Sequence, residues 1–195
     1  MKPKLILIAG PNGAGKSFNA PDIVPELDHF DFDELKQAFY KADKDHEFRE
    51  QFAHAKAQKA FEAAKENALN KKDSFAYETN FFTETCMDTP RRFKNAGYDI
   101  DLYFVYLQDV EISKERVNIR VKLGGHYVPA EEIEHRFKNG LCNVKNSYSE
   151  FDNFYLIDGE TSKAVLCCQK GQLVESPEIL PDFVKNNFDL SDPVS

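Results

Sequence analysis

The sequence predicts an α/β fold in which a mainly parallel central sheet carries helices on both faces. Short apolar, β-prone runs alternate with segments of helical periodicity along the chain. The first run, residues 5–9, is apolar throughout, which is typical of a central parallel strand. The chain of 195 residues, 42% of them hydrophobic, is long enough to bury one core. We therefore expect a single domain over residues 1–195.

The segments after the first strand continue the alternation as far as Gly97. A Gly-rich turn and a stretch with Pro21 and Pro25 come first. The patterns that follow predict strands over residues 29–32 and 74–77 and helices over residues 34–42, 48–69 and 84–96. In residues 48–69 the apolar positions recur every three or four residues, as in an amphipathic helix. Gly97 is expected to end the last of these helices.

The second half of the chain predicts two more parallel strands, three helices and a hairpin. The strands are expected over residues 101–107 and 154–157, and the helices over residues 111–123, from Pro129 onward and over 179–187. The helix after Pro129 carries one apolar stripe, formed by Ile133, Phe137, Leu141, Val144 and Tyr148. Residues 164–168 and 172–175 predict a hairpin that turns at Lys170 and Gly171.

The Gly-rich turn matches the phosphate-binding pattern G-x-x-x-x-G-K-[ST] in full. Its residues are Gly10, Pro11, Asn12, Gly13, Ala14, Gly15, Lys16 and Ser17. Glycines let the backbone curl so that successive amide N–H groups point at phosphate oxygens. The lysine of this pattern bridges the β- and γ-phosphates, and the hydroxyl of the last residue binds magnesium. The chain is therefore expected to bind ATP and Mg²⁺ in a P-loop NTPase three-layer sandwich.

Polar side chains follow two of the predicted strands. Asp33 lies beyond the second strand, at the edge of the sheet that the phosphate loop also faces, where a carboxylate can accept a proton from a hydroxyl. Asp33 equally suits the N-cap of the helix that follows it. Glu78, Thr79 and Asn80 follow the next strand and reach the same crevice, unless they form an ordinary turn. Asp109 stands where a second magnesium carboxylate is conventional, or is a simple loop aspartate.

Three arginines are candidates for phosphate contacts. Arg116 and Arg120 lie four residues apart on one predicted helix, and Arg136 lies on the next. The Gly-Gly-His-Tyr-Val-Pro segment between these helices, residues 124–129, predicts a hinged, small helical lid over the nucleotide. Arg116 could instead form a surface pair with neighbouring glutamates of its own helix, Glu111 and Glu115.

Charge and composition exclude several classes of protein. The formal net charge of −8 argues against a nucleic-acid groove, which needs a basic face. No apolar stretch is long enough to span a bilayer, so no membrane association is expected. The four cysteines lack metal-ligand spacing and are expected to be reduced thiols of a cytoplasmic protein: Cys86, Cys142, Cys167 and Cys168.

Taken together, these motifs resemble the zeta-toxin-like P-loop kinases, also described as predicted ABC-type ATPases. The resemblance rests on the phosphate loop, on the Phe-Asp-Glu of residues 32–34, on residues 77–81 and most closely on residues 97–143, with their Gly-Gly-His-x-Val-Pro block. It implies that Asp33 is the general base and that Lys16, Arg120 and Arg136 contact the phosphates. It also implies that Glu78, with Thr79 and Asn80, holds the acceptor.

The chain departs from the family pattern where the acceptor would bind. Asn80 stands where the family members that phosphorylate UDP-N-acetylglucosamine have Thr, and Phe82 stands where they often have Arg. Asp31 replaces the family's Asn before the base. We therefore expect a kinase that phosphorylates a hydroxyl of a small molecule, with a UDP-N-acetylglucosamine-like nucleotide sugar as the candidate acceptor. One alternative is an ATP-binding and ATP-hydrolysing module that regulates an antitoxin-like protein partner. Another is a kinase of a different metabolite, such as a nucleoside.

Overall fold

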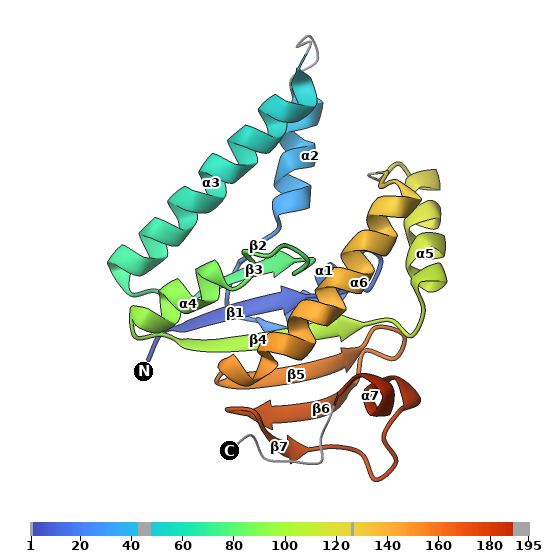
Figure 1. Ribbon diagram of the computed structural model, residues 1–195. Helices are drawn as coiled ribbons and strands as arrows, with labels where there is room; N and C mark the ends of the chain where they lie inside the picture. Colours follow the sequence, from blue (N-terminus) through green and yellow to red (C-terminus); the bar gives the residue numbers. More distant parts are fainter. Residues whose placement is uncertain (1, 43–47, 126, 189–195) are drawn as a thin grey trace.

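The computed structural model describes residues 2–42, 48–125 and 127–188. Within these ranges the strands form one sheet in the order β2-β3-β1-β4-β5-β6-β7, parallel from β2 to β5 and antiparallel beyond (Figure 1). The strands are β1 (Lys4–Ala9), β2 (His29–Phe30), β3 (Phe75–Thr79), β4 (Asp99–Tyr106), β5 (Asn153–Asp158), β6 (Ala164–Gln169) and β7 (Gln172–Glu175). The predicted parallel sheet and its C-terminal hairpin are confirmed.

The helices follow the predicted order, with one addition. They are α1 (Lys16–Ile23), α2 (Phe32–Ala42), α3 (Arg49–Lys71), α4 (Asp88–Asn95), α5 (Val110–Lys122), α6 (Ala130–Ser147) and α7 (Asp182–Asn187), and a 3₁₀ turn, Tyr148–Glu150, follows α6. The addition, α1, runs through Pro21, which hid it in the sequence pattern. β3 extends to Thr79, so Glu78 and Thr79 belong to the strand and not to a turn after it.

Helices cover both faces of the sheet, as a three-layer fold requires. Leu7 of β1 points to the face where Phe93 of α4 and Val144 of α6 complete the main core. The next residue, Ile8, points to the other face and packs against Ala20 of α1. Such alternation is the period of a strand buried on both sides.

Two helical hairpins connect parallel strands: α2 begins after the end of β2 and α3 returns to the start of β3, and α5 and α6 connect β4 to β5 in the same way. α2 and α3 pack against each other on one side, and α5 and α6 form the other hairpin (Figure 1). The ring of Phe61 in α3 meets the ring of Tyr77 in β3 edge-on at 5.2 Å, which anchors the first hairpin to the sheet. The space between the hairpins lies over the carboxyl ends of the strands, where open α/β sheets bind ligands.

The structure also bears on two expectations from composition. All four cysteines are free thiols. No helix in the described part of the chain combines the length and the apolar character needed to cross a membrane.

Candidate active site

The phosphate loop curls between β1 and α1. Gly10 has a φ of +147°, and a Cβ at this position would lie 2.2 Å from the carbonyl oxygen of Val105 on β4, so no other residue fits. Lys16 Nζ donates to the carbonyl oxygens of Gly10 (3.0 Å) and Pro11 (3.2 Å) and to Oδ1 of Asn80 (3.1 Å). The ammonium group is thereby held at the centre of the loop, where the pattern requires it.

Burial lowers the pKa of Lys16, while the negative charges of Glu78, Asp33 and Asp31 raise it in opposition. Three carboxylates are therefore close enough to act electrostatically on the lysine of the loop. The sequence predicted that Asp33 and Glu78 face one crevice, and in the structure both line the same cavity.

Two carboxylates lie beside the hydroxyl of Ser17. Ser17 Oγ donates to Oε2 of Glu78 at 3.0 Å and lies 3.5 Å from Oδ2 of Asp31. The other oxygen of Glu78, Oε1, is buried and lies 3.1 Å from Nε2 of His29 without accepting a hydrogen bond. Burial, and then the charge of Asp31, raise the pKa of Glu78. The sequence indicated Asp31 only as a departure from the family pattern next to Asp33, and its contact with Ser17 emerges from the structure.

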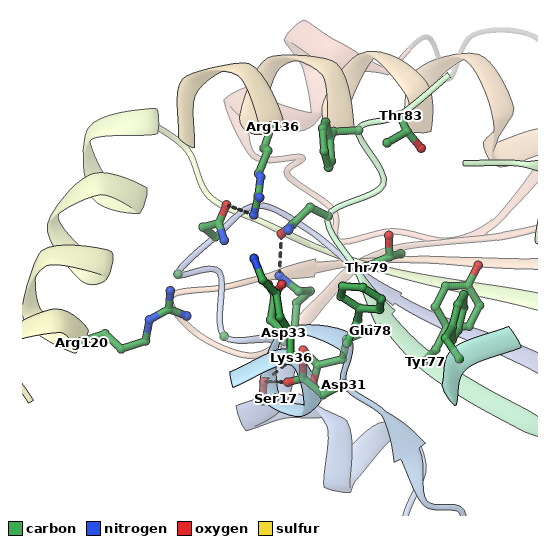
Figure 2. A pocket seen from close by; sticks show the side chains of 18 of the residues that line it. Ser17, Asp31, Asp33, Lys36, Tyr77, Glu78, Thr79, Thr83, Arg120 and Arg136 are labelled. Carbon is green, nitrogen blue, oxygen red and sulfur yellow. Dashed lines mark hydrogen bonds between the residues drawn. The ribbon is translucent and has the colours of Figure 1, made fainter. Parts of the chain in front are cut away.

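Asp31 also caps α2, because its Oδ1 accepts a 3.0 Å hydrogen bond from the backbone N–H of Glu34. The alternative role of Asp33 as the N-cap is therefore wrong, since the neighbouring aspartate fills it. Asp33 lies in the first turn of α2 with its side chain exposed toward the phosphate loop (Figure 2).

Arg116 fastens the phosphate loop to the end of β5. Its Nη1 donates to the carbonyl oxygens of Gly13 (3.2 Å) and Gly159 (2.8 Å). The alternative of a surface pair with Glu111 is not what the structure shows, because Glu111 pairs with Lys114 at 2.7 Å. Arg116 thus helps to hold the phosphate loop in position.

Arg136 of α6 extends toward the same loop. Its Nη1 lies 3.5 Å from Oδ1 of Asn12, and its guanidinium carbon lies 5.3 Å from the centre of the Phe82 ring. The side chain also pairs with Glu132 one turn earlier. Its Nε is buried without a hydrogen-bond partner, and a bound anion would satisfy it.

Arg120 lines the cavity from the last turn of α5, and backbone hydrogen bonds hold that turn in place. Gly124, with a φ of +85°, donates its N–H to Val121 O, and Gly125 donates to Arg120 O, each at 2.9 Å. This is the Schellman arrangement that ends a helix. The two glycines thus form a hydrogen-bonded helix end; His126 of the predicted lid lies outside the described residues. Asp109 caps the other end of α5 by accepting from Glu111 N, which confirms its simple loop role.

These side chains line one cavity of about 610 Å³ between the two hairpins (Figure 2). It includes most of the predicted site residues: Asn12, Gly13, Gly15, Lys16, Ser17, Asp33, Glu78, Thr79, Asn80, Arg120 and Arg136. Gly10, Pro11 and Ala14 are buried residues of the loop itself and do not line the cavity. The volume is within the range of small-molecule and cofactor sites.

Comparisons of the sequence with known proteins found a matching family model and a relative. The model of the zeta toxin family matches residues 1–166. An uncharacterised protein of Haemophilus influenzae is 29% identical over 143 residues, which cover 70% of this chain and 94% of that protein.

Solved structures share the fold at low sequence identity. The complex of AvrRxo1-ORF1 with AvrRxo1-ORF2 and sulphate ions superposes with a TM-score of 0.75 at 14% identity; the match covers 100% of this chain but only 66% of that longer one. The same complex has also been solved with ATP, with a TM-score of 0.66, 13% identity and the same coverage. The PezAT chromosomal toxin–antitoxin system of Streptococcus pneumoniae gives a TM-score of 0.64 at 17% identity, over 85% of this chain and 71% of that chain.

Proposed function

This chain belongs to the zeta toxin family, and on that premise we propose that it transfers the γ-phosphate of ATP to a hydroxyl group of a small molecule. The observation that carries the proposal is the position of Asp33. Its carboxylate has no capping role and faces a cavity whose other walls carry Lys16, Arg120 and Arg136. A base opposite a cationic phosphate site is the arrangement of a phosphotransferase.

The donor end of the cavity suits the triphosphate of ATP. The backbone of the phosphate loop and Lys16 would hold the β- and γ-phosphates. The buried, unpartnered Nε of Arg136 would donate to a phosphate oxygen. Among the structural relatives, AvrRxo1-ORF1 has been solved in a complex with ATP, which supports the same donor here.

The oxygen atoms around Ser17 suit a magnesium ion. The Ser17 hydroxyl and the carboxylates of Asp31 and Glu78 form the all-oxygen donor set that magnesium prefers, and Glu78 Oε1 has no hydrogen bond of its own. When bound, magnesium would neutralise charge on the β- and γ-phosphates. Asp31 and Glu78 thus join Ser17 as proposed ligands.

The chain's own residues would serve the transfer step. Asp33 accepts the proton of the acceptor hydroxyl, whose oxygen then bonds to the γ-phosphorus as ADP leaves. Lys16 and the two arginines stabilise the charge that spreads over the transferring group. Glu78, Thr79 and Asn80 line the acceptor side and would orient the hydroxyl.

The proposal extends to the acceptor molecule and to the cellular compartment. A UDP-N-acetylglucosamine-like nucleotide sugar is the first acceptor to test, because the family resemblance implies it, with other hydroxyl-bearing metabolites beside it. The proposed compartment is the cytoplasm, where ATP is available and thiols stay reduced. The net charge of −8 gives no support to nucleic-acid binding, and we propose neither a nucleic-acid nor a membrane partner.

A second candidate function is an ATP-hydrolysing module that controls an antitoxin-like protein. Phe18, directly after Ser17, is 77% exposed, and Leu123 beyond the end of α5 is 83% exposed. Large apolar side chains left exposed beside a cleft are typical of a protein-binding surface. A partner of this kind is compatible with either function.

The two candidates differ in where the phosphate goes. Purified protein is incubated with γ-labelled ATP and magnesium, with and without a pooled metabolite extract. A kinase releases ADP in equal amount to the label that enters an organic molecule, and both need the extract. Release of labelled inorganic phosphate at one rate in both samples would contradict the proposal and support the hydrolysing module.

A further inference from the structure

Charge divides the cavity into a donor end and an acceptor end. The donor end holds four cations: Lys16, Arg116, Arg120 and Arg136. Asp33 is the carboxylate on the acceptor side, while Asp31 and Glu78 lie between the two ends, beside the hydroxyl of Ser17. Figure 2 shows Arg120 at one extreme and Tyr77 at the other, with Asp33 and Glu78 between them. A molecule that binds beside Tyr77 therefore meets the carboxylates before it meets the arginines.

The cation that reaches the acceptor end already has a partner. Lys36 of α2 is the one lysine or arginine that lines this end within the described part of the chain. Its Nζ lies 3.0 Å from Oε1 of Glu50 on α3. Phe82, on the loop after β3, contributes an apolar ring beside Arg136. A phosphorylated acceptor would thus meet the negative charge of Asp33 and, at this end, a lysine that is already paired, and such an arrangement disfavours anions.

Aromatic side chains take the place of cations at this end. Phe32 from α2, Phe61 from α3 and Tyr77 from β3 line it. Neutral hydrogen-bonding groups lie among them: His54, Gln58, Thr79 and Thr83. Rings from separate elements provide faces and edges on which a planar ring stacks, and neutral amide and hydroxyl groups match its polar edge.

We infer that the acceptor is an uncharged molecule with a planar ring system close to the reacting hydroxyl, as in a nucleoside. The inference rests on the proposed phosphotransfer and narrows its substrate. The hydroxyl oxygen bonds to the γ-phosphorus, the bond from that phosphorus to the bridging oxygen of ADP breaks, and the proton goes to Asp33. The ring lies beside Phe32 and Phe61, while the hydroxyl points toward the phosphate loop.

The direct test is a matched panel of acceptors with the full chain, γ-labelled ATP and magnesium. The panel holds adenosine, guanosine, cytidine and uridine, each beside its 5′-monophosphate, together with UDP-N-acetylglucosamine and a pooled metabolite extract. We expect at least one nucleoside to be phosphorylated with a kcat/KM about tenfold or more above its own monophosphate and the nucleotide sugar, the scale of one stacking or charge contact.

Two variants test the charge of the acceptor and the stacking of its ring separately. Glu50→Gln leaves Lys36 without its carboxylate and is expected to raise kcat/KM for the monophosphate about fivefold or more, with the nucleoside unchanged. Phe32→Leu keeps an apolar side chain but removes the ring, and is expected to raise the KM for the nucleoside about fivefold without changing the KM for ATP. The control is Phe39→Leu, the same change on the same helix outside the cavity.

The possible failures differ from one another. Preference for a monophosphate or for the nucleotide sugar, or label in a metabolite without a planar ring, would overturn the inference and leave the kinase function standing. Label that passes only to water would overturn both. Wild-type kinetics for Phe32→Leu would remove the aromatic wall from acceptor binding.

Discussion

The hydroxyl of Ser17 donates a 3.0 Å hydrogen bond to Glu78, which joins the last residue of the phosphate loop to the end of the neighbouring strand β3. Oδ2 of Asp31, the residue after β2, lies 3.5 Å from the same hydroxyl oxygen. The start of α1, the end of β3 and the residue after β2 thus meet at one oxygen atom. The predictions below follow from this junction and from the residues around it.

Ser17→Ala removes the hydroxyl at the junction. We expect the magnesium concentration for half-maximal activity to rise about tenfold or more, a loss that even outer-shell changes can cause. Ser17→Thr keeps the hydroxyl and is the matched control. Magnesium titration of initial rates measures both, and equal midpoints for Ala and Thr would contradict the assignment.

Asp33→Asn keeps the shape of the side chain but cannot take up a proton. The turnover number is expected to fall about 10²- to 10⁴-fold, the usual contribution of a general base, while the Kd for ATP stays close to that of the wild type. Calorimetric titration with a non-hydrolysable ATP analogue measures binding. A parallel loss of ATP affinity would remove Asp33 from the role of base.

Glu78→Gln is expected to stabilise the protein in a pH-dependent way. Burial and the charge of Asp31 raise the pKa of Glu78 from 4.5 in the folded state. The ionised carboxyl therefore destabilises the fold above the raised pKa, and this cost disappears below the unfolded value, where both states are protonated. Relative to the wild type, the Tm should rise by a few degrees at about pH 8 and by little at about pH 4.

The measurement for this variant is calorimetry without nucleotide at both pH values. Transfer activity is expected to be lost at the same time, because Glu78 is a proposed ligand and positioning group. A Tm difference of the same size at both pH values would show that ionisation of Glu78 is not its cause.

Arg116→Ala breaks the connection between the phosphate loop and Gly159. Charged hydrogen bonds contribute about 1.5–3 kcal/mol, so the affinity for ATP should fall about 10- to 100-fold. Lys122→Ala, a charge deletion at an exposed position of the same helix, is the control. Binding of a fluorescent ATP analogue measures both variants, and equal affinities would contradict the positioning role.

Arg120→Ala is expected to lower turnover more than ATP affinity. An arginine that meets the transferring phosphoryl group contributes a factor on the order of 10³ or more to the rate. Gly125→Ala tests the same residue indirectly, because a Cβ at Gly125 would lie 2.5 Å from Cγ of Arg120. Initial rates and ATP titration separate the two parameters, and unchanged turnover would exclude Arg120 from the step.

The sequence was sufficient for those parts of the structure that depend on local patterns. The phosphate loop and each parallel strand are recognisable from a few adjacent residues, since a buried strand needs only a short apolar run. α1 escaped because Pro21 normally ends a helix, whereas here it lies inside an eight-residue helix that the loop initiates.

The roles of Asp31 and Arg116 depended on distances that no local pattern contains. Whether Asp31 or Asp33 caps α2 is decided by where the helix begins, and boundaries are the least certain part of a sequence-based prediction. Arg116 contacts Gly159, which is 43 residues away along the chain. Its neighbours in sequence offered a plausible but incorrect partner.

The two helical hairpins contribute different walls of the cavity from separate stretches of the chain. In the proposed kinase, α2 and α3 with the end of β3 would form the wall that meets the acceptor, while α5, α6 and the loop after β1 would form the wall that meets the nucleotide. Substitutions in α2 and α3 would therefore alter the choice of acceptor while the phosphate loop, α5 and α6 keep their own contacts with ATP.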